Sequence, residues 1–212
     1  LLIGTWDVSH FGGLTEKWRA GDDDGPKRDL HSLRVITEII RRVDVGAVRE
    51  IRGNLKTIRH TTQALGPDWG FGLTHVTRGD PGNDERRGFI FDRRTTRISG
   101  LAGELVVPEA EFDRIDPDAL DRQFARTPYA VAFRCGGETF VLVTRHVLRG
   151  DGPDDRPPQL RAIAEWLGQG GRDVNPGGHH PIGLGDFKTA PRGDARVADF
   201  VSTGVGGAAG PP

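Results

Sequence analysis

The sequence predicts an α/β (α+β) protein in which helices pack outside stacked mixed sheets. Two observations support this prediction. The first third of the chain alternates between apolar runs of strand length and segments with helical periodicity, and the middle consists of strand-like runs joined by turn signals. Helices that alternate with strands cover the faces of a sheet, whereas hairpins add antiparallel strands to it.

The first 65 residues contain two expected strands and two expected helices. The strands are the apolar runs over residues 3–8 and 45–51. Residues 28–43 predict a helix, because apolar residues recur there every three or four positions. These positions are Leu30, Leu33, Ile36, Ile40 and Val43. A second, shorter helix is expected over residues 55–65, capped by Asn54, whose side chain can accept a hydrogen bond from an early helical amide.

Strand-like runs dominate the chain from residue 69 onward. They cover residues 70–76, 87–92, 101–107, 129–135 and 139–147. The pair Gly136-Gly137 predicts a tight hairpin turn between the last two runs. A third amphipathic helix is expected over residues 160–167, and a final strand carries Asp186.

We expect one large domain over residues 1–212. A glycine-rich and acidic stretch at residues 12–26 predicts a surface loop, and the small residues at 204–212 predict a flexible tail. The sequence contains no methionine, even at its first position, and we interpret it as incomplete at both ends.

Composition and charge limit the class of protein. No apolar run approaches the roughly eighteen residues of a membrane helix, so we expect a soluble protein without a membrane span. The single cysteine, Cys135, excludes an intrachain disulfide, favours a reducing compartment such as the cytoplasm and leaves secretion open. The 29 basic and 30 acidic residues nearly cancel, so phosphate recognition is expected to be local. Nothing in the sequence indicates the oligomeric state.

Acidic residues accompany apolar strand-like runs at three places. They are Asp7, Glu50 and Asp186, the last of which follows Gly185. If the three strand ends lie side by side, their carboxylates form an oxygen-rich pocket suited to Mg²⁺ or Mn²⁺. The competing interpretation is that each acid simply faces solvent.

Five short motifs occur in a familiar order along the chain. They are TWDV at 5–8, VREI at 48–51, ERRGFIF at 85–91, LVTRHV at 142–147 and GDFK at 185–188. Together they resemble the endonuclease/exonuclease/phosphatase superfamily, which contains pancreatic-type deoxyribonucleases, apurinic endonucleases, neutral sphingomyelinases and inositol polyphosphate phosphatases. The resemblance spans essentially the whole chain. It depends on the order of the motifs, because no single motif is specific.

The resemblance implies a four-layered αββα sandwich of two mixed sheets flanked by helices, deoxyribonuclease-like and incomplete at its C-terminus. It also implies Mg²⁺-dependent attack of water on a phosphate ester. By position, Glu50 would be the principal metal ligand, with Asp7 and Asp186 as further ligands. A metal suits this chemistry because it neutralises phosphate oxygens and lowers the pKa of bound water.

The resemblance gives catalytic roles to further residues. Asp186 would also position the attacking water or the phosphate, and His146 would stabilise or protonate phosphate oxygens. Glu85 matches a glutamate that holds this histidine, and Arg126 matches an arginine that contacts phosphate. Taken alone, His146 in an apolar strand is more often a satisfied core histidine, and Glu85 and Arg126 are ordinary surface charges.

The chain departs from the family pattern inside the active site. The family has asparagine at the positions of Asp7 and Lys188, and commonly glutamine at Arg49. Asp7 can still bind a cation, whereas Lys188, assigned with Arg126 to substrate binding, would weaken metal binding electrostatically. The family's closing aspartate-histidine pair has no counterpart after Asp186, so the general-base contribution to the rate is expected to be lost.

These observations lead to three functional hypotheses. The first is a nuclease-like hydrolase that cleaves phosphodiester bonds with Mg²⁺ or Mn²⁺, most plausibly in nucleic acid, with weak or no turnover in this chain. The second is a catalytically inactive phosphate- or nucleic-acid-binding domain, indicated by Arg49, Lys188 and the missing base. The third is a small-molecule or lipid phosphoesterase, which shares the chemistry and differs in its substrate loops.

Overall fold

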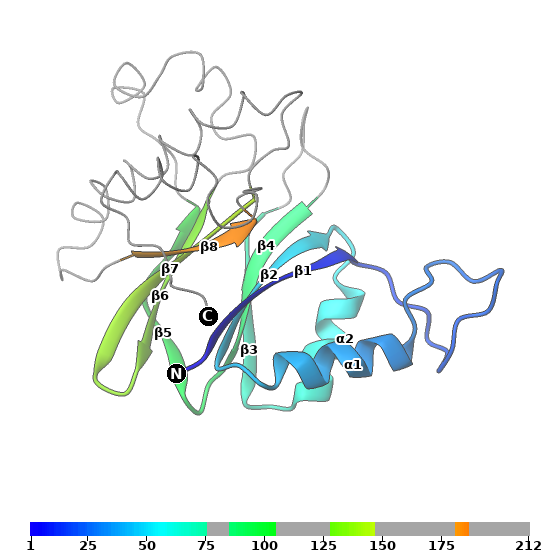
Figure 1. Ribbon diagram of the computed structural model, residues 1–212, viewed down its shortest axis with the longest axis horizontal. Coiled ribbons are helices and arrows are strands. Elements are labelled where there is room, and N and C mark those ends of the chain that lie inside the picture. Colours follow the sequence, from blue (N-terminus) through cyan, green and yellow to red (C-terminus); the bar gives the residue numbers. More distant parts are fainter. Residues whose placement is uncertain (76–84, 105–127, 147–180, 187–212) are drawn as a thin grey trace, which may run out of the picture.

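The computed structural model of the protein describes residues 1–75, 85–104, 128–146 and 181–186 (Figure 1). The side chains of Arg145, His146 and Asp186 lie outside this description, although their backbone is included. The described residues form two four-stranded sheets and two helices. The sheets have the strand orders β1-β2-β4-β3 and β5-β6-β7-β8.

The first sheet is mixed. Strand β1 (Ile3–Phe11) runs parallel to β2 (Val45–Arg52), which pairs antiparallel with β4 (Glu85–Asp92). Strand β3 (Trp69–Leu73) is antiparallel to β4 at the other edge. Two parallel neighbours need a crossover connection, and helix α1 (Leu30–Ile40) supplies it.

Helix α1 begins at an acidic cap and ends before the strand that follows. The carboxylate of Asp29 accepts from the backbone N–H of Ser32 at 2.7 Å and so satisfies an amide at the start of the helix. The expected helix over 28–43 is shorter in the structure because Asp44 begins the return to the sheet. Its Oδ2 accepts from the backbone N–H of Leu2 at 2.6 Å, which fixes β2 beside β1.

Helix α2 (Lys56–Leu65) begins beside the residue expected to cap it. Oδ1 of Asn54 accepts from the backbone N–H of Lys56 at 2.9 Å, which confirms the predicted hydrogen bond, although the N-cap position itself is Leu55. Both helices pack on one face of the first sheet. There Ile36 and Ile58 join Val48 and Ile51 of β2 in one buried cluster.

The second sheet is also mixed. Strands β5 (Thr96–Glu104), β6 (Tyr129–Cys135) and β7 (Glu138–His146) are antiparallel neighbours, and β8 (Pro181–Asp186) runs parallel to β7. The predicted turn at Gly136 and Gly137 is confirmed, with Gly136 at a φ of 60°. Strand β5 begins earlier than the predicted 101–107 run. It is an edge strand with many exposed side chains, so its first half lacks an apolar pattern.

Aromatic side chains join the two sheets. The ring of Phe133, which is completely buried, lies 5.4 Å from the rings of both Phe89 and Phe91 on the first sheet. Val45 and Ala47 of β2 belong to the same cluster, so β2 is covered by helices on one face and by the second sheet on the other. The described layers are therefore helix, sheet and sheet, in agreement with the predicted sandwich.

Several predicted elements lie outside the described residues. They are the third helix at 160–167 and the tail at 204–212. The expected loop at 12–26 contains neither helix nor strand and extends from the end of β1 towards α1 (Figure 1). Among the described helices, none has the length and apolar character that crossing a membrane requires.

Candidate active site

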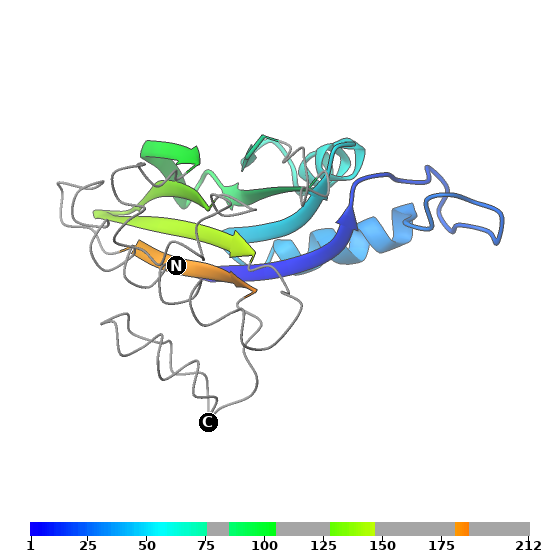
Figure 2. The same cartoon turned by 90° about the horizontal axis from the view of Figure 1, so that it is seen from above.

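Four strand ends define one side of the molecule. Strands β1 and β2 are parallel in the first sheet, and β7 and β8 are parallel in the second. The arrows of β1, β7 and β8 point the same way in Figure 2, and β8 contacts both β1 and β2. The carboxyl ends of strands from both sheets therefore lie on the same side, where sheets of this kind commonly bind ligands.

Two consecutive backbone amides hold the first two predicted acids. The N–H of Ser9 donates to Oδ1 of Asp7 at 3.1 Å, and the N–H of His10 donates to Oε2 of Glu50 at 3.1 Å. Consecutive residues are separated by about 3.8 Å, so the two carboxylates lie within about 10 Å of each other. The structure thus brings together Asp7 and Glu50, which are far apart in the sequence.

The backbone around these acids has an unusual conformation. Ser9, His10 and Glu50 have φ angles of 45°, 51° and 57°, in the left-handed region that non-glycine residues rarely adopt. The β1–β2 register shifts between Asp7 and Phe11, and the β2–β4 register shifts between Val48 and Ile51. Such irregularities redirect side chains and are frequent beside active sites.

The free oxygens of these carboxylates are suited to a divalent cation. Oδ2 of Asp7 and Oε1 of Glu50 accept no hydrogen bond from the other described residues. Hard oxygen ligands of this kind fit Mg²⁺, which binds through one or two carboxylates and retains several waters. Within the described part of the chain, no three His, Cys, Asp or Glu side chains gather into a metal-binding group.

Arg49 places a positive charge beside the predicted metal ligands. It is the register partner of Asp7 on β2, and its side chain is almost fully buried. Its Nη1 donates to Oγ1 of Thr5 at 3.2 Å. A neighbouring guanidinium lowers the attraction of Asp7 for a cation.

Glu85 lies close to the same edge, at the start of β4. Its carboxylate is buried, and Oε1 is 3.5 Å from Nη2 of Arg52. The same guanidinium nitrogen lies 2.8 Å from Nδ1 of His10. Arg52 therefore links the buried Glu85 to the residue whose backbone amide holds Glu50.

The second sheet contributes two predicted catalytic positions. His146 and Asp186 are register partners at the ends of the parallel strands β7 and β8. Their backbones are adjacent, and their side chains lie outside the described residues, as do the whole of Arg126 and Lys188. The predicted contact between Glu85 and His146 therefore stays a prediction.

Ser9, His10 and Arg52 contribute to this site and were not identified from the sequence. A positive φ is usually signalled by glycine, and Ser9 and His10 give no such signal. Arg52 follows Glu50 by two residues, but its role depends on the pairing of β1, β2 and β4.

The arrangement defines a two-sheet α/β sandwich with an acidic edge. No protein-family model and no curated protein matches the sequence. Solved structures do match the fold. The chain is similar to an endonuclease/exonuclease/phosphatase family protein from Bacteroides thetaiotaomicron, with a TM-score of 0.60, 17% identity, and coverage of 91% of this chain and 66% of that one.

Two further solved structures resemble the chain. The catalytic domain of human Nocturnin with bound sulfate gives a TM-score of 0.58 at 13% identity, covering 80% of this chain and 60% of that one. D. rerio TDP2 complexed with single-strand DNA product gives a TM-score of 0.52 at 13% identity, covering 80% and 57%. The chain thus spans less than two thirds of each of these proteins. The chain therefore shares the fold of these solved structures.

Proposed function

We propose that the chain is a Mg²⁺-dependent hydrolase of phosphodiester bonds that acts on nucleic acid. The observation that carries this proposal is the pair of consecutive amides, Ser9 and His10, which donate to the carboxylates of Asp7 and Glu50 near the carboxyl ends of β1 and β2. Strained backbone that orients two carboxylates is expensive, and it is typical of sites that perform chemistry. The fold supports the same conclusion.

The solved structures with this fold favour a phosphate ester as substrate. Nocturnin was crystallised with sulfate, a tetrahedral anion with the shape of phosphate, and TDP2 with a single-strand DNA product. Both ligands carry oxyanions, and a cation bound by acidic residues can neutralise the charge of such groups. These similarities favour nucleic acid over a lipid or a small phosphate ester.

Asp7 and Glu50 would hold the cation through their free oxygens. Bound there, Mg²⁺ would neutralise phosphate charge and acidify a water. We assign Asp186 to orienting the attacking water and His146 to donating a proton to a phosphate oxygen, because their backbones are adjacent at the end of the second sheet. Glu85 would orient His146, and Arg126 and Lys188 would bind the phosphate of the substrate.

A second candidate function is supported by one strand pairing. Arg49 is the register partner of Asp7, so a positive charge lies beside one of the expected metal ligands. A guanidinium beside this acid would attract a phosphate without a metal, which favours an inactive phosphate- or nucleic-acid-binding domain. The two candidates differ in whether the chain binds Mg²⁺ and turns over.

Two measurements distinguish the two candidate functions. Calorimetric titration with Mg²⁺ and Mn²⁺ measures metal binding, and hydrolysis of bis-(p-nitrophenyl) phosphate together with plasmid nicking measures turnover. The hydrolase proposal expects saturable metal binding and turnover that are both lost in Glu50→Gln. Glu38→Gln is the matched control, because Glu38 is an exposed acid on α1. Metal binding and cleavage that persist in Glu50→Gln contradict the proposal, and oligonucleotide binding without metal binding or cleavage favours the second candidate.

A further inference from the structure

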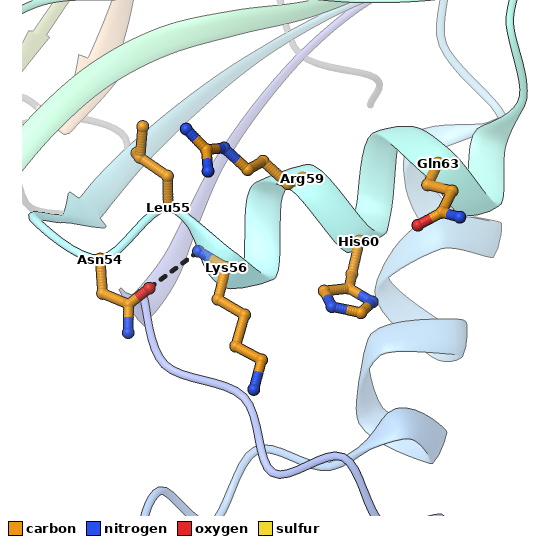
Figure 3. Close-up of a pocket in the computed structure, with 6 residues that line it drawn as sticks. All are labelled: Asn54, Leu55, Lys56, Arg59, His60 and Gln63. Carbon is orange, nitrogen blue, oxygen red and sulfur yellow. Dashed lines mark hydrogen bonds between the residues drawn. The ribbon is translucent and has the colours of Figure 1, made fainter.

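A hollow lies beside the start of helix α2. It has a volume of about 310 Å³ and is open to solvent. Its lining residues are Asn54, Leu55, Lys56, Arg59, His60 and Gln63 (Figure 3). Five of these six side chains are polar or basic, and none of them is acidic.

The basic residues of the hollow share the first two turns of α2. Lys56, Arg59 and His60 are spaced three and four residues apart, which places them on neighbouring positions of the helix surface. Figure 3 shows the side chains of Lys56 and His60 extending to the same side, while the guanidinium of Arg59 extends towards Leu55. The side chains of Lys56 and Arg59, which both line the hollow, therefore extend in different directions from the helix.

These positive charges are only partly compensated. Oε1 of Glu16, an exposed residue in the loop between β1 and α1, lies 3.2 Å from Nζ of Lys56 and 3.7 Å from Nε2 of His60. Arg59 is exposed and forms no ion pair with any other residue that the structure describes. An exposed carboxylate that pairs with a half-buried lysine is weakly held, so an incoming anion can replace it at small cost.

The amides at the start of α2 already have partners. The N–H of Lys56 donates to Asn54, and the N–H of Thr57 donates to the carbonyl oxygen of Gly12 at 3.0 Å. A ligand in the hollow would therefore be bound by side chains. Lysine and arginine side chains that line an open hollow suit phosphate oxygens.

The segment that joins β2 to α2 connects the hollow to the candidate active site along the chain. Asn54 follows Glu50 by four residues, so their Cα atoms are at most about 14 Å apart. One strand of a nucleic acid duplex carries a phosphate every 3.4 Å or so along its axis, so this span corresponds to roughly four phosphates. Nη1 of Arg86 donates to the carbonyl oxygens of Arg52 and Gly53, at 3.1 and 3.0 Å, and fixes the connecting segment.

We propose that the hollow on α2 binds backbone phosphates of a nucleic acid strand, a few nucleotides from the bond held at the candidate active site. The distance between the bound phosphates and a cleaved bond rests on the proposed function, whereas phosphate binding by Lys56 and Arg59 does not. The contact is made to the backbone, so it adds affinity without base specificity.

The test is fluorescence anisotropy of a labelled single-stranded oligonucleotide, measured with EDTA at several salt concentrations. The variant Lys56→Gln/Arg59→Gln is compared with Arg34→Gln/Arg42→Gln, which removes the same charge from exposed positions on and just after α1. Each phosphate contact on a single strand contributes about 0.7 to the slope of log affinity against log salt, so the first variant is expected to lose roughly 1.4. Hydrolysis of bis-(p-nitrophenyl) phosphate with Mg²⁺ is measured in parallel.

Weaker oligonucleotide binding and a reduced salt slope in the α2 variant alone support the proposal. An unchanged slope, an equal loss in the α1 control, or no binding by the original chain overturns it. If the α2 variant loses binding to anionic phospholipid vesicles while its oligonucleotide binding is unchanged, the proposal is also overturned, because the partner is then a membrane. If bis-(p-nitrophenyl) phosphate is not hydrolysed while binding depends on α2, the proposed function fails and the phosphate-binding hollow stands.

Discussion

The backbone N–H of His10 donates to Oε2 of Glu50 at 3.1 Å, and both residues have φ angles in the left-handed region, 51° and 57°. Neither residue is glycine, so each conformation costs about 1–2 kcal/mol relative to ordinary backbone. The cost is tolerated where β1 and β2 lose their regular register. The strain therefore coincides with the orientation of a carboxylate that we assign to metal binding.

Replacing Glu50 by glycine should separate stability from function. Glycine adopts a φ of 57° without a steric penalty, which offsets the loss of the hydrogen bond from His10, so Glu50→Gly is expected to leave the free energy of unfolding nearly unchanged. The same substitution removes the carboxylate and should abolish Mg²⁺ binding. Urea denaturation and calorimetry measure the two effects.

Arg97→Gly is the control for this substitution. Arg97 is exposed on β5 and does not have a positive φ, so glycine there should lower stability by about 0.5–1 kcal/mol. If Glu50→Gly destabilises the protein as much as Arg97→Gly does, the strain at Glu50 has no energetic significance.

Arg52 and Glu85 should be energetically coupled. Glu85 is buried and Nη2 of Arg52 lies 3.5 Å from its carboxylate, so Arg52→Met is expected to lower the free energy of unfolding by roughly 1–3 kcal/mol. Glu85→Gln in the Arg52→Met background should cost much less than in the original chain. A double-mutant cycle measured by urea denaturation gives the coupling, and a coupling near zero would mean that other groups satisfy Glu85.

Gly88 should not tolerate a side chain. A Cβ at this position would lie 2.4 Å from the carbonyl oxygen of Gly72 and 2.4 Å from Cδ2 of Leu73, so β3 would have to move away from β4. We expect Gly88→Ala to destabilise the protein by about 1–3 kcal/mol. Gly103→Ala on β5 is the control, because no atom lies within 4 Å of its added Cβ. Equal unfolding midpoints for the two variants would contradict the packing of β3 on β4.

The cap of α1 should make stability depend on pH. Hydrogen bonds from the side chain and backbone of Ser32, and from the backbone of Ala20, hold the pKa of Asp29 well below its usual range. A depressed folded-state pKa means that the stabilisation is complete above the unfolded pKa of about 3.9 and is lost as the pH falls below it.

The variant Asp29→Asn isolates this effect, since asparagine also caps helices well. Its unfolding midpoint in urea should lie below that of the original chain at pH 7, and the difference should shrink below about pH 4. A difference that stays constant between pH 7 and pH 3 would show that the charge of Asp29 contributes nothing to stability.

The sequence was sufficient to predict the elements with a strong local pattern. Strand β2, helix α2 and the turn at Gly136 have clear periodicity or turn chemistry, and the structure confirms them. Strand β5 was placed too late, because an exposed edge strand lacks the apolar pattern on which such predictions depend. The sandwich itself followed from the order of five short motifs and is confirmed by the solved structures.

The candidate site was predicted in part. The carboxylates of Asp7 and Glu50 accept hydrogen bonds from consecutive amides, as expected if their strand ends lie side by side, whereas the pairing of His146 with Asp186 was not part of that expectation. The Ser9-His10 amides were not predictable, because their role depends on a backbone conformation that neither side chain favours. The roles of the predicted site residues stay predictions.

The division of the proposed site between two sheets has a consequence for synthesis on the ribosome. The strands that hold Asp7 and Glu50 are complete once Asp92 has been added, whereas Asp186 is the last residue of β8. At about 5–20 residues per second, the second half of the site emerges several seconds after the first. A nascent chain therefore carries only half of the proposed site while it remains next to ribosomal and messenger RNA.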